Sequence, residues 1–514
     1  MSTLARASLA AVALLAAAAA GPARGLPPQA QPEAVPQPEP AAPPAAAKAG
    51  AGPPARGAEL GEEIVVTATR SPRPPRDAPA DVTVMGREEI ERNPGKAVDE
   101  VLRLLPEFST FRRSSSVAAD PTSSGVSLRG VGPSAASRSL VLVDDVPAND
   151  AFKDNIWWRA IPPLGIQRIE VVPGGGSALY GNYALAGVTQ VLSRPITPGT
   201  VDALAEYGSF DTRRLSAWGS HRAGPVGGAL EADLFDTDGY FVVAPYARGP
   251  ADTRAPSKHA VGSGRLELEA ARDLLLTGRG SFFYEDYNGG TRYTTAAVRR
   301  WEYAAGAHWT PGEAGALDLS LSGHVVEFFQ DRARFAPAPA PPRSQEFLAG
   351  RQHVPANDLG ASLVWRSKPL SLAGSHNLVA GADARWIDGE VRETLYPATI
   401  PPPPALSPVV QRNGGGKQQL YGVFAEDVYD VSQAVQVTAA LRYDYWANLN
   451  GNIFQQRDDG STQSDLFSFR RDGQLDPRLG LRVRASDWLT LRAAAYHAFR
   501  APNLDELYRS FQVG

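Results

Sequence analysis

Two groups of neighbouring residues in the 514-residue sequence are of types that could carry out chemistry. Asp144 and Asp145 are adjacent carboxylates, which could serve as a general acid and a general base. The run Gly174-Gly175-Gly176-Ser177 could suggest a phosphate cradle, but it lacks the Lys-Ser/Thr pair that a phosphate-binding loop needs. Because glycine readily adopts positive φ angles, we expect this run to form a tight turn.

The other reactive residue types show no arrangement typical of an enzyme. The sequence has no cysteine, which excludes a thiol nucleophile, a thiolate metal site and a disulfide. It also has no Gly-x-Ser-x-Gly nucleophile motif. The seven histidines show no close metal-ligand spacing; they are His221, His259, His308, His324, His353, His376 and His497. We therefore expect no enzymatic activity, no cofactor and no metal site.

Composition limits the partners and the compartment of the chain. The net charge is only -4 and the Lys and Arg residues are scattered, so we expect no nucleic-acid-binding surface. Arg6 precedes an apolar run at residues 9–20 and then small residues, which is typical of a secretory signal peptide, assigned here to residues 1–24. No other apolar run approaches the roughly 18 residues of a transmembrane helix. If the chain spans a membrane, it must therefore do so as a β-barrel.

The segments before residue 200 differ sharply in composition. Residues 25–61 are rich in Pro and Ala and cannot bury enough apolar surface to fold, so we expect a disordered tail. Residues 62–70 are a lone β-branched stretch, followed by a Pro-rich linker at 71–80, and their unpaired backbone is suited to joining the sheet edge of a partner. Residues 81–197 mix expected strands with short helices, which predicts a compact α/β domain.

Residues 200–514 show a different and uniform pattern. Roughly thirteen segments of about ten residues alternate apolar and polar side chains between Gly, Asp or Pro turns, as in residues 317–322 (LDLSLS). A soluble β-sandwich would show the same alternation. Abutting hairpins and long Pro-rich connections at 245–257, 336–355 and 396–416 favour a membrane barrel, as do aromatic side chains near strand ends. The tryptophans in such positions are Trp218, Trp301, Trp309, Trp365, Trp446 and Trp488.

Several stretches resemble, in the same order, the motifs of TonB-dependent outer-membrane receptors. The lone strand resembles their TonB box through Glu63, Ile64, Val65, Val66, Thr67 and Ala68. Four stretches between residues 126 and 181 resemble their plug domain; these contain Arg129, Gly130, Asp144, Asp145, Arg168, Glu170, Gly176, Tyr180 and Gly181. Residues 499–508 (FRAPNLDELY) resemble a motif that recurs in their barrel. The chain departs from the family at Pro173, where an Arg is usual, and at residues 186–190 (AGVTQ), where Gly-Gly-Val-Ile-Asn is common.

The resemblance implies a mainly β fold, with an α/β plug domain at 81–197 followed by a transmembrane antiparallel β-barrel. The full barrel would have about 22 strands, of which residues 200–514 supply roughly 13, so we expect the last strands to be missing. The implied function is TonB-dependent active transport of a ferric siderophore, cobalamin or another large nutrient across the bacterial outer membrane. The implied partners of the monomer are TonB with the ExbB/ExbD complex, the ligand, and outer-membrane lipid.

Two alternatives to active transport stay open. A signalling receptor of the outer membrane would normally carry an extra folded domain before the TonB box, and residues 25–61 are too rich in Pro and Ala to form one. A passive porin or an adhesin-type barrel would not need a plug domain of this size.

The resemblance also suggests roles for single residues. Asp144 and Asp145 fall in a strand-end turn of the plug, which favours a structural role over catalysis. Arg129 and Arg168 either contact the ligand or are buried and pair with barrel carboxylates such as Glu426, and we favour the pairing. The plug apex at 152–158 and the loop tips of the barrel are the expected ligand contacts, through Lys153, Trp157, Trp158, Tyr284 and Tyr287.

Overall fold

The structure is a computed structural model. It describes residues 70, 78, 80–112, 114–117, 119–131, 136–336, 341–397 and 408–509, and all of these belong to one compact unit that begins at Ile64. The expected signal peptide at 1–24, the tail at 25–61, the TonB box from Glu63 to Ala68 and most of the linker lie outside the described residues. No helix within the described residues is both long enough and apolar enough to cross a membrane.

The N-terminal domain, called the plug domain below (residues 81–197), is built around a five-stranded sheet with the order β1-β6-β7-β4-β5. Its strands are β1 (Thr83–Gly86), β4 (Leu140–Val143), β5 (Val146–Pro147), β6 (Ile166–Pro173) and β7 (Gly187–Ser193). A separate hairpin joins β2 (Phe108–Thr110) to β3 (Val126–Leu128). The helices are α2 (Arg87–Arg92), α3 (Val98–Leu102), α4 (Ser177–Tyr180) and the 3-10 turns η2 (Trp158–Ala160) and η3 (Pro163–Gly165).

An apolar core between these elements holds the plug domain together. Met85, Leu102, Leu128 and Ile169 are fully or almost fully buried in it. The indole of Trp158 packs edge-on against Phe108, with ring centroids 6.0 Å apart. Burial of side chains of this size contributes about 1.5–3 kcal/mol each, so the plug domain has a core of its own.

The second part of the chain forms one large antiparallel sheet, in which each strand pairs with its neighbours in sequence. Thirteen strands lie on its continuous path, in agreement with the expected number. They are β8 (Thr200–Gly208), β9 (Thr212–Ala223), β10 (Val226–Thr237), β11 (Ser257–Ala271), β12 (Leu274–Asn288), β13 (Thr295–Trp309), β14 (Ala316–Phe335), β15 (Glu346–Arg366), β17 (Ser375–Leu395), β18 (Val410–Asp430), β19 (Val435–Arg457), β21 (Arg470–Ser486) and β22 (Leu489–Tyr496).

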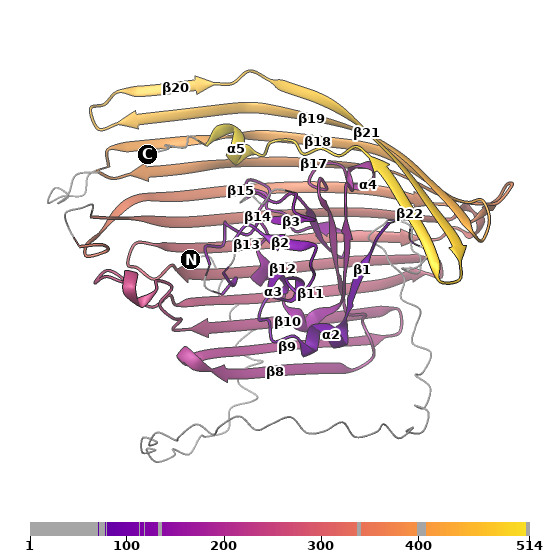
Figure 1. Cartoon of the computed structure of the whole chain (residues 1–514), viewed down its shortest axis with the longest axis horizontal. Helices are drawn as coiled ribbons and strands as arrows, with labels where there is room; N and C mark the ends of the chain where they lie inside the picture. Colours follow the sequence, from indigo (N-terminus) through magenta and orange to yellow (C-terminus); the bar gives the residue numbers. More distant parts are fainter. Residues whose placement is uncertain are drawn as a thin grey trace, which may run out of the picture. The chain divides into compact units, whose positions relative to one another are not determined.

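Short elements complete this sheet. Strands β16 (Leu370–Ser371) and β20 (Thr462–Leu466) pair beside the path, with β17 and β19 respectively. The helical turns are η4 (Ser209–Asp211), η5 (Pro245–Ala247), η6 (Gly312–Ala314) and α5 (Leu504–Tyr508). Figure 1 shows the strands in sequence order from β8 to β22, with α5 next to β18.

Several strands are longer than the sequence pattern predicts. Strand β15 includes residues 346–355, which were expected to belong to a long connection. Pro355 lies inside this strand and pairs with Glu327 of β14, while the pairing with β17 is interrupted between His353 and Ala356. Proline has no backbone N–H to donate, which accounts for a one-sided ladder and for a sequence that does not read as a strand.

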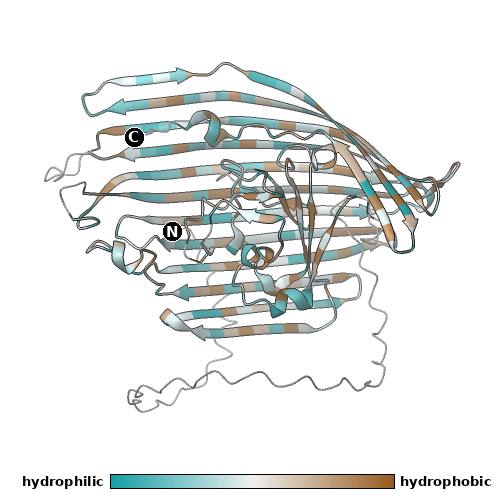
Figure 2. Ribbon diagram, in the orientation of Figure 1, coloured by the Kyte–Doolittle hydropathy of each residue, from teal (hydrophilic) through white to brown (hydrophobic). Residues whose placement is uncertain are grey.

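The two faces of the large sheet differ in polarity. On the inner face, which contacts the plug domain, β13 places Val298, Arg300 and Glu302, all buried. On the outer face the same strand places Trp301 and Tyr303, both exposed. Exposed Leu, Val and Tyr side chains continue on the outer face of β14 to β19, and the alternation along the strands is visible in Figure 2. An exposed apolar band of this kind suits a lipid environment.

One tryptophan departs from the expected ring of aromatic residues at the membrane surface. Trp218 is buried on the inner face of β9, where the guanidinium of Arg194 lies 3.6 Å from its ring centroid. Successive side chains of a strand point to opposite faces of the sheet. The sequence of β9 did not show which of its two alternating sets of side chains faces inward.

Candidate functional site

The interface between the plug domain and the inner face of the large sheet contains buried charges. The guanidinium of Arg159, in η2, pairs with the Glu285 carboxylate of β12, and both side chains are almost completely buried. The Asp144 carboxylate accepts a hydrogen bond from Arg279 of β12 at 3.1 Å. Removing one partner of the Arg159–Glu285 pair leaves a buried charge at a cost of about 3–5 kcal/mol. Charge pairs therefore contribute to holding the plug domain against β11 and β12.

A second contact joins the plug apex to the segment after β22. Asp154 is fully buried and has a φ of +59°, and its Oδ2 accepts hydrogen bonds from Arg500 at 3.0 Å and Asn503 at 3.1 Å. Burial raises the pKa of Asp154 to about 7, and the nearby positive charge of Arg500 only partly opposes this. The apex loop is thus tied to residues that follow it by more than 300 positions.

The local sequence of residues 499–508 explains how this segment can make the contact. Asn503 caps α5 by accepting from the backbone N–H of Glu506, and Glu506 accepts in return from the backbone of Asn503. Both oxygens of the Glu506 carboxylate also accept from Nη2 of Arg500, at 2.6 and 2.8 Å. The backbone N–H of Ala501 donates to Asn182 of the plug domain at 2.8 Å. The motif was expected in the barrel, but its docking onto the plug domain was not.

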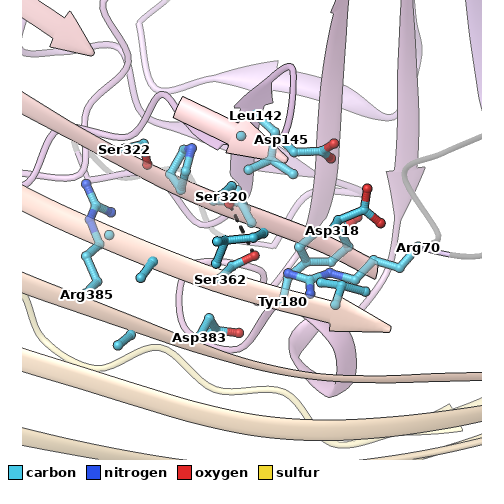
Figure 3. A pocket seen from close by; sticks show the side chains of 18 of the residues that line it. Arg70, Leu142, Asp145, Tyr180, Asp318, Ser320, Ser322, Ser362, Asp383 and Arg385 are labelled. Carbon is cyan, nitrogen blue, oxygen red and sulfur yellow. Dashed lines mark hydrogen bonds between the residues drawn. The ribbon is translucent and has the colours of Figure 1, made fainter. Parts of the chain in front are cut away.

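Between the plug domain and the large sheet lies a cavity of about 400 Å³ (Figure 3). Short residues on the inner face of β13, β14 and β15 form one wall: Gly306, Ser320, Ser322, Gly360 and Ser362. The plug domain lines the opposite side through Leu142, Asp145, Tyr180, Asn182 and Tyr183. Figure 3 shows Arg70 and Asp318 towards one end of the cavity and Arg385 towards the other. Because these side chains of the sheet are short, they leave a space that the plug domain does not fill.

Arg70, the last residue of the expected TonB box, lies at this cavity. Its guanidinium is 4.4 Å from the ring centroid of Tyr180 in the plug domain and 4.6 Å from that of Phe424 in β18. A cation–π contact contributes about 0.5–2 kcal/mol, depending on its exposure to water. This end of the box is therefore held between the plug domain and the sheet by contacts that are individually weak.

The turn residues of the plug motifs lie where the sequence predicts turns. Asp144 and Asp145 connect β4 to β5 with φ angles of +49° and +66°, as in a two-residue hairpin turn. Gly174 has a φ of +105° in the turn after β6, and Gly176 precedes α4. Gly181 has a φ of +66°, and a Cβ atom there would come within 2.6 Å of Arg442, so only glycine fits this close approach.

The arginines of the plug motifs make different contacts from those expected. Arg129 and Gly130 are exposed with positive φ angles, and Arg129 pairs with Asp81 of the same domain at 2.7 Å. The expectation of a buried arginine facing a barrel carboxylate is therefore wrong for Arg129, because the turn after β3 directs it into solvent. Arg168 donates to Glu170 at 2.9 Å, since residues two apart lie on the same face of β6. Arg159, which was not singled out, makes the buried pair with the sheet.

The expected ligand contacts divide into two groups. Trp158 is only 2% exposed in the core of the plug domain, and Tyr284 lies on the outer face of β12, where it donates to Asp286. The assignment of Trp158 and Tyr284 as ligand contacts stays a prediction. Trp157 and Tyr287 are buried where the plug apex meets the sheet, and the ammonium of Lys153 lies 4.9 Å from the Phe328 ring centroid. These three remain placed at the apex interface.

Within the described part of the chain, no group of three or more His, Cys, Asp or Glu side chains is placed to hold a metal ion.

Family models match most of the chain. Residues 74–188 match the TonB-dependent receptor plug domain, and residues 227–514 match the β-barrel of TonB-dependent receptors. The chain is 32% identical over 193 residues to the vitamin B12 transporter BtuB of Vibrio vulnificus (strain CMCP6). That match covers 37% of this chain and 30% of the relative.

Solved structures share the fold at low sequence identity. The alcaligin outer-membrane receptor FauA from Bordetella pertussis is 16% identical with a TM-score of 0.61, covering 86% of this chain and 66% of that one. The ferric-catecholate import receptor Fiu from E. coli K12 is 11% identical with a TM-score of 0.66, covering 84% and 71%. The family models and the shared fold agree. The chain belongs to the TonB-dependent receptor family, and like that family it is a protein of the bacterial outer membrane.

Proposed function

We propose that this protein imports a scarce ligand across the outer membrane by TonB-dependent active transport. The observation that carries the proposal is the position of Arg70, at the end of the TonB box and between the plug domain and the sheet. A force applied to the box would act first on this residue. Because its contacts with Tyr180 and Phe424 are weak, a modest pull releases them.

The charged interface between plug domain and sheet suits a plug that must move. An apolar interface would resist separation because apolar surface is unfavourable in water. The pair of Arg159 and Glu285 and the pair of Asp144 and Arg279 regain hydration when water enters between them. These charge pairs make the closed interface specific and can separate into water, whereas the apolar contacts at the plug apex, such as Phe152 and Trp157 with the sheet, oppose separation.

The partners and the ligand follow from the same proposal. Residues 62–70 would add as a strand to the sheet of TonB, which the ExbB/ExbD complex energises. The ligand is a ferric siderophore, cobalamin or another large nutrient, in keeping with the vitamin B12, alcaligin and ferric-catecholate proteins that the chain resembles. The protein acts as a monomer surrounded by lipid.

Deletion of residues 62–70 tests the proposal. Cells that produce the deletion variant should bind the ligand but no longer accumulate it, measured with a radiolabelled panel of ferric siderophores and cobalamin. Deletion of nine residues from the Pro/Ala-rich tail, residues 40–48, is the matched control and should leave accumulation unchanged. Full accumulation by the 62–70 deletion would overturn the proposal.

A further inference from the structure

A row of charged side chains crosses the inner face of the large sheet between two points of the plug domain. The row, called the wall relay below, takes one residue each from β12, β13, β14, β15 and β17, which are neighbours in the sheet (Figure 1). Its members in this order are Arg279, Glu302, His324, Asp358 and Arg385. Arg279 donates to the carboxylate of Asp144 in the plug domain at 3.1 Å, and Arg385 donates to the backbone oxygen of Asn149 at 3.1 Å. The wall relay therefore contacts both ends of the plug segment 144–149, which contains β5.

The register of the sheet places the three central members of the wall relay side by side. His324 of β14 pairs directly with Glu302 of β13 on one side and with Asp358 of β15 on the other. Opposed residues on one face of an antiparallel sheet have Cβ atoms about 4.5–5.5 Å apart, so the ring and the carboxylates must meet. The three side chains are only 3–5% exposed. Solvent ions therefore screen the charges of this group only weakly.

The two ring nitrogens of His324 face carboxylates on opposite sides. Nδ1 lies 2.8 Å from Asp358 Oδ1, and because a carboxylate can only accept, this nitrogen carries a proton. Nε2 lies 3.6 Å from Glu302 Oε2 and has no hydrogen-bond acceptor within the described residues. That separation is too long for a hydrogen bond, but the nitrogen lies in the field of the carboxylate. A proton on Nε2 makes this contact attractive, so the geometry favours the doubly protonated, positively charged ring.

Three arginines contact the same two carboxylates. They are Arg279, Arg300 and Arg385. Arg300 donates at 2.7 Å to Oε2 of Glu302, the oxygen that faces the ring, and its charge opposes a positive charge on His324. Arg279 and Arg385 contact the other oxygen of Glu302 and of Asp358, at 3.2 Å and 2.5 Å. With a charged His324, positive and negative side chains therefore alternate along the whole wall relay.

We propose that His324 is a pH-sensitive positioning residue, which in its doubly protonated form completes the wall relay and holds the plug segment 144–149 against the sheet. Carboxylates ordinarily titrate near pH 4 and guanidinium groups above about pH 12, so His324 is the member of the wall relay whose charge changes near neutral pH. Its contribution is fully present below about pH 6.5, where the unfolded chain also holds the proton. The contribution is lost as pH rises through the point at which the folded protein releases that proton.

The inference goes beyond the proposed import function. It concerns the contact between the plug segment and the sheet before any ligand or TonB is bound. When the ring of His324 loses a proton, the alternation of charges is broken at its centre, and the Glu302 carboxylate faces a nitrogen lone pair. Acid therefore favours the closed arrangement of this segment, and alkali favours its opening.

Hydrogen exchange of the purified protein in detergent, read by mass spectrometry of peptides that cover residues 140–150, tests the proposal. The backbone N–H groups of Asp144 and Ala148 donate to other strands of the plug domain, so they exchange when the segment opens. Their protection, relative to an unstructured chain at the same pH, should fall about tenfold between about pH 7 and about pH 9. This range lies above the pKa of about 7 of Asp154, whose titration would otherwise contribute.

Two histidine variants separate the wall relay from a general effect of pH. The His324→Gln variant cannot gain a positive charge, so its protection should not fall over this range. His259→Gln is the matched control, because His259 is also buried on the inner face, in β11, but lies beside Asp233 and outside the wall relay. It should keep the fall that the wild-type protein shows.

A variant of a neighbouring carboxylate tests the same point without altering the histidine. Glu302→Gln removes one of the two negative charges that face the ring, so the fall in protection should move to lower pH. A fall that is lost in His324→Gln and kept in His259→Gln supports the proposal. Constant protection of the wild-type protein, an equal fall in His324→Gln, or an unmoved fall in Glu302→Gln would each refute it. Deletion of residues 62–70 bears on import alone, so either result can fail without the other.

Discussion

Arg500 donates a hydrogen bond to the buried carboxylate of Asp154, a residue 346 positions earlier in the chain, at 3.0 Å. This pair connects the plug apex to the segment after β22, and Asn503 of that segment donates to the same oxygen. The contact therefore places the titratable carboxyl group of Asp154 beside a positive charge, Arg500, from the segment after β22.

The stability of the apex contact should depend on pH. Burial raises the pKa of Asp154 from its usual value of 3.8 to about 7, so the folded chain holds this proton more tightly than the unfolded chain does. Stability is then lost as pH rises from about 4 to about 7, at up to about 1.4 kcal/mol per pH unit. The Asp154→Asn variant has no such titration. Its melting temperature relative to wild type, measured by circular dichroism, should rise across this range and level off above it; a constant difference would contradict the prediction.

The Asp154–Arg500 pair should also be energetically coupled. In a double-mutant cycle with Asp154→Asn and Arg500→Gln, we expect a coupling free energy of about 1.5–3 kcal/mol, because the pair is buried and one partner is charged. Chemical denaturation of the four proteins measures it. Asp81 and Arg129 are the matched comparison, because they are 2.7 Å apart but 69% and 50% exposed, and should couple by less than about 1 kcal/mol. Equal coupling in both pairs would rule out this interpretation.

Removal of Arg70 should release the TonB box. The Arg70→Ala variant loses both ring contacts, worth about 1 kcal/mol or more together, which corresponds to about a fivefold or greater increase in the exposed population. The chain contains no cysteine, so Val65→Cys provides a unique label site in the box. Its rate of reaction with a water-soluble maleimide should rise in the Arg70→Ala background. Arg129→Ala serves as the control for loss of a positive charge elsewhere in the plug domain. An unchanged rate in Arg70→Ala would show that the contacts of Arg70 do not hold the expected TonB box.

The buried pair of Arg159 and Glu285 should show an asymmetric response to mutation. The Arg159→Leu variant leaves the Glu285 carboxylate unpaired against the plug domain and should destabilise the protein by about 3–5 kcal/mol. The double variant Arg159→Leu, Glu285→Leu removes both charges and should recover most of that loss. Limited proteolysis of the plug domain at increasing urea concentration measures both. A double variant no more stable than Arg159→Leu would mean that altered packing, and not the unpaired charge of Glu285, causes the loss of stability.

Local sequence features determined much of the fold. Period-two alternation predicted the thirteen strands of the large sheet, because facing inward or outward depends only on a residue's position along its own strand. The turn at Asp144 and Asp145 and the turn at Gly174 were likewise predictable, since positive φ angles depend on the residue types present. The motifs between residues 126 and 181 and at 499–508 were enough to indicate the family.

Only the tertiary structure decided which residues meet at the interface. The sequence near Arg159 does not identify Glu285 as its partner, and the sequence near Asp154 does not identify Arg500. Each pair is separated by more than a hundred residues and is brought together only when the plug domain packs against the rest of the chain. Packing within the plug domain buries Trp158 in that domain's own core. Where the plug domain and the sheet fail to fill the space between them, the donors of Tyr183 and Arg385 have no acceptor within the described residues.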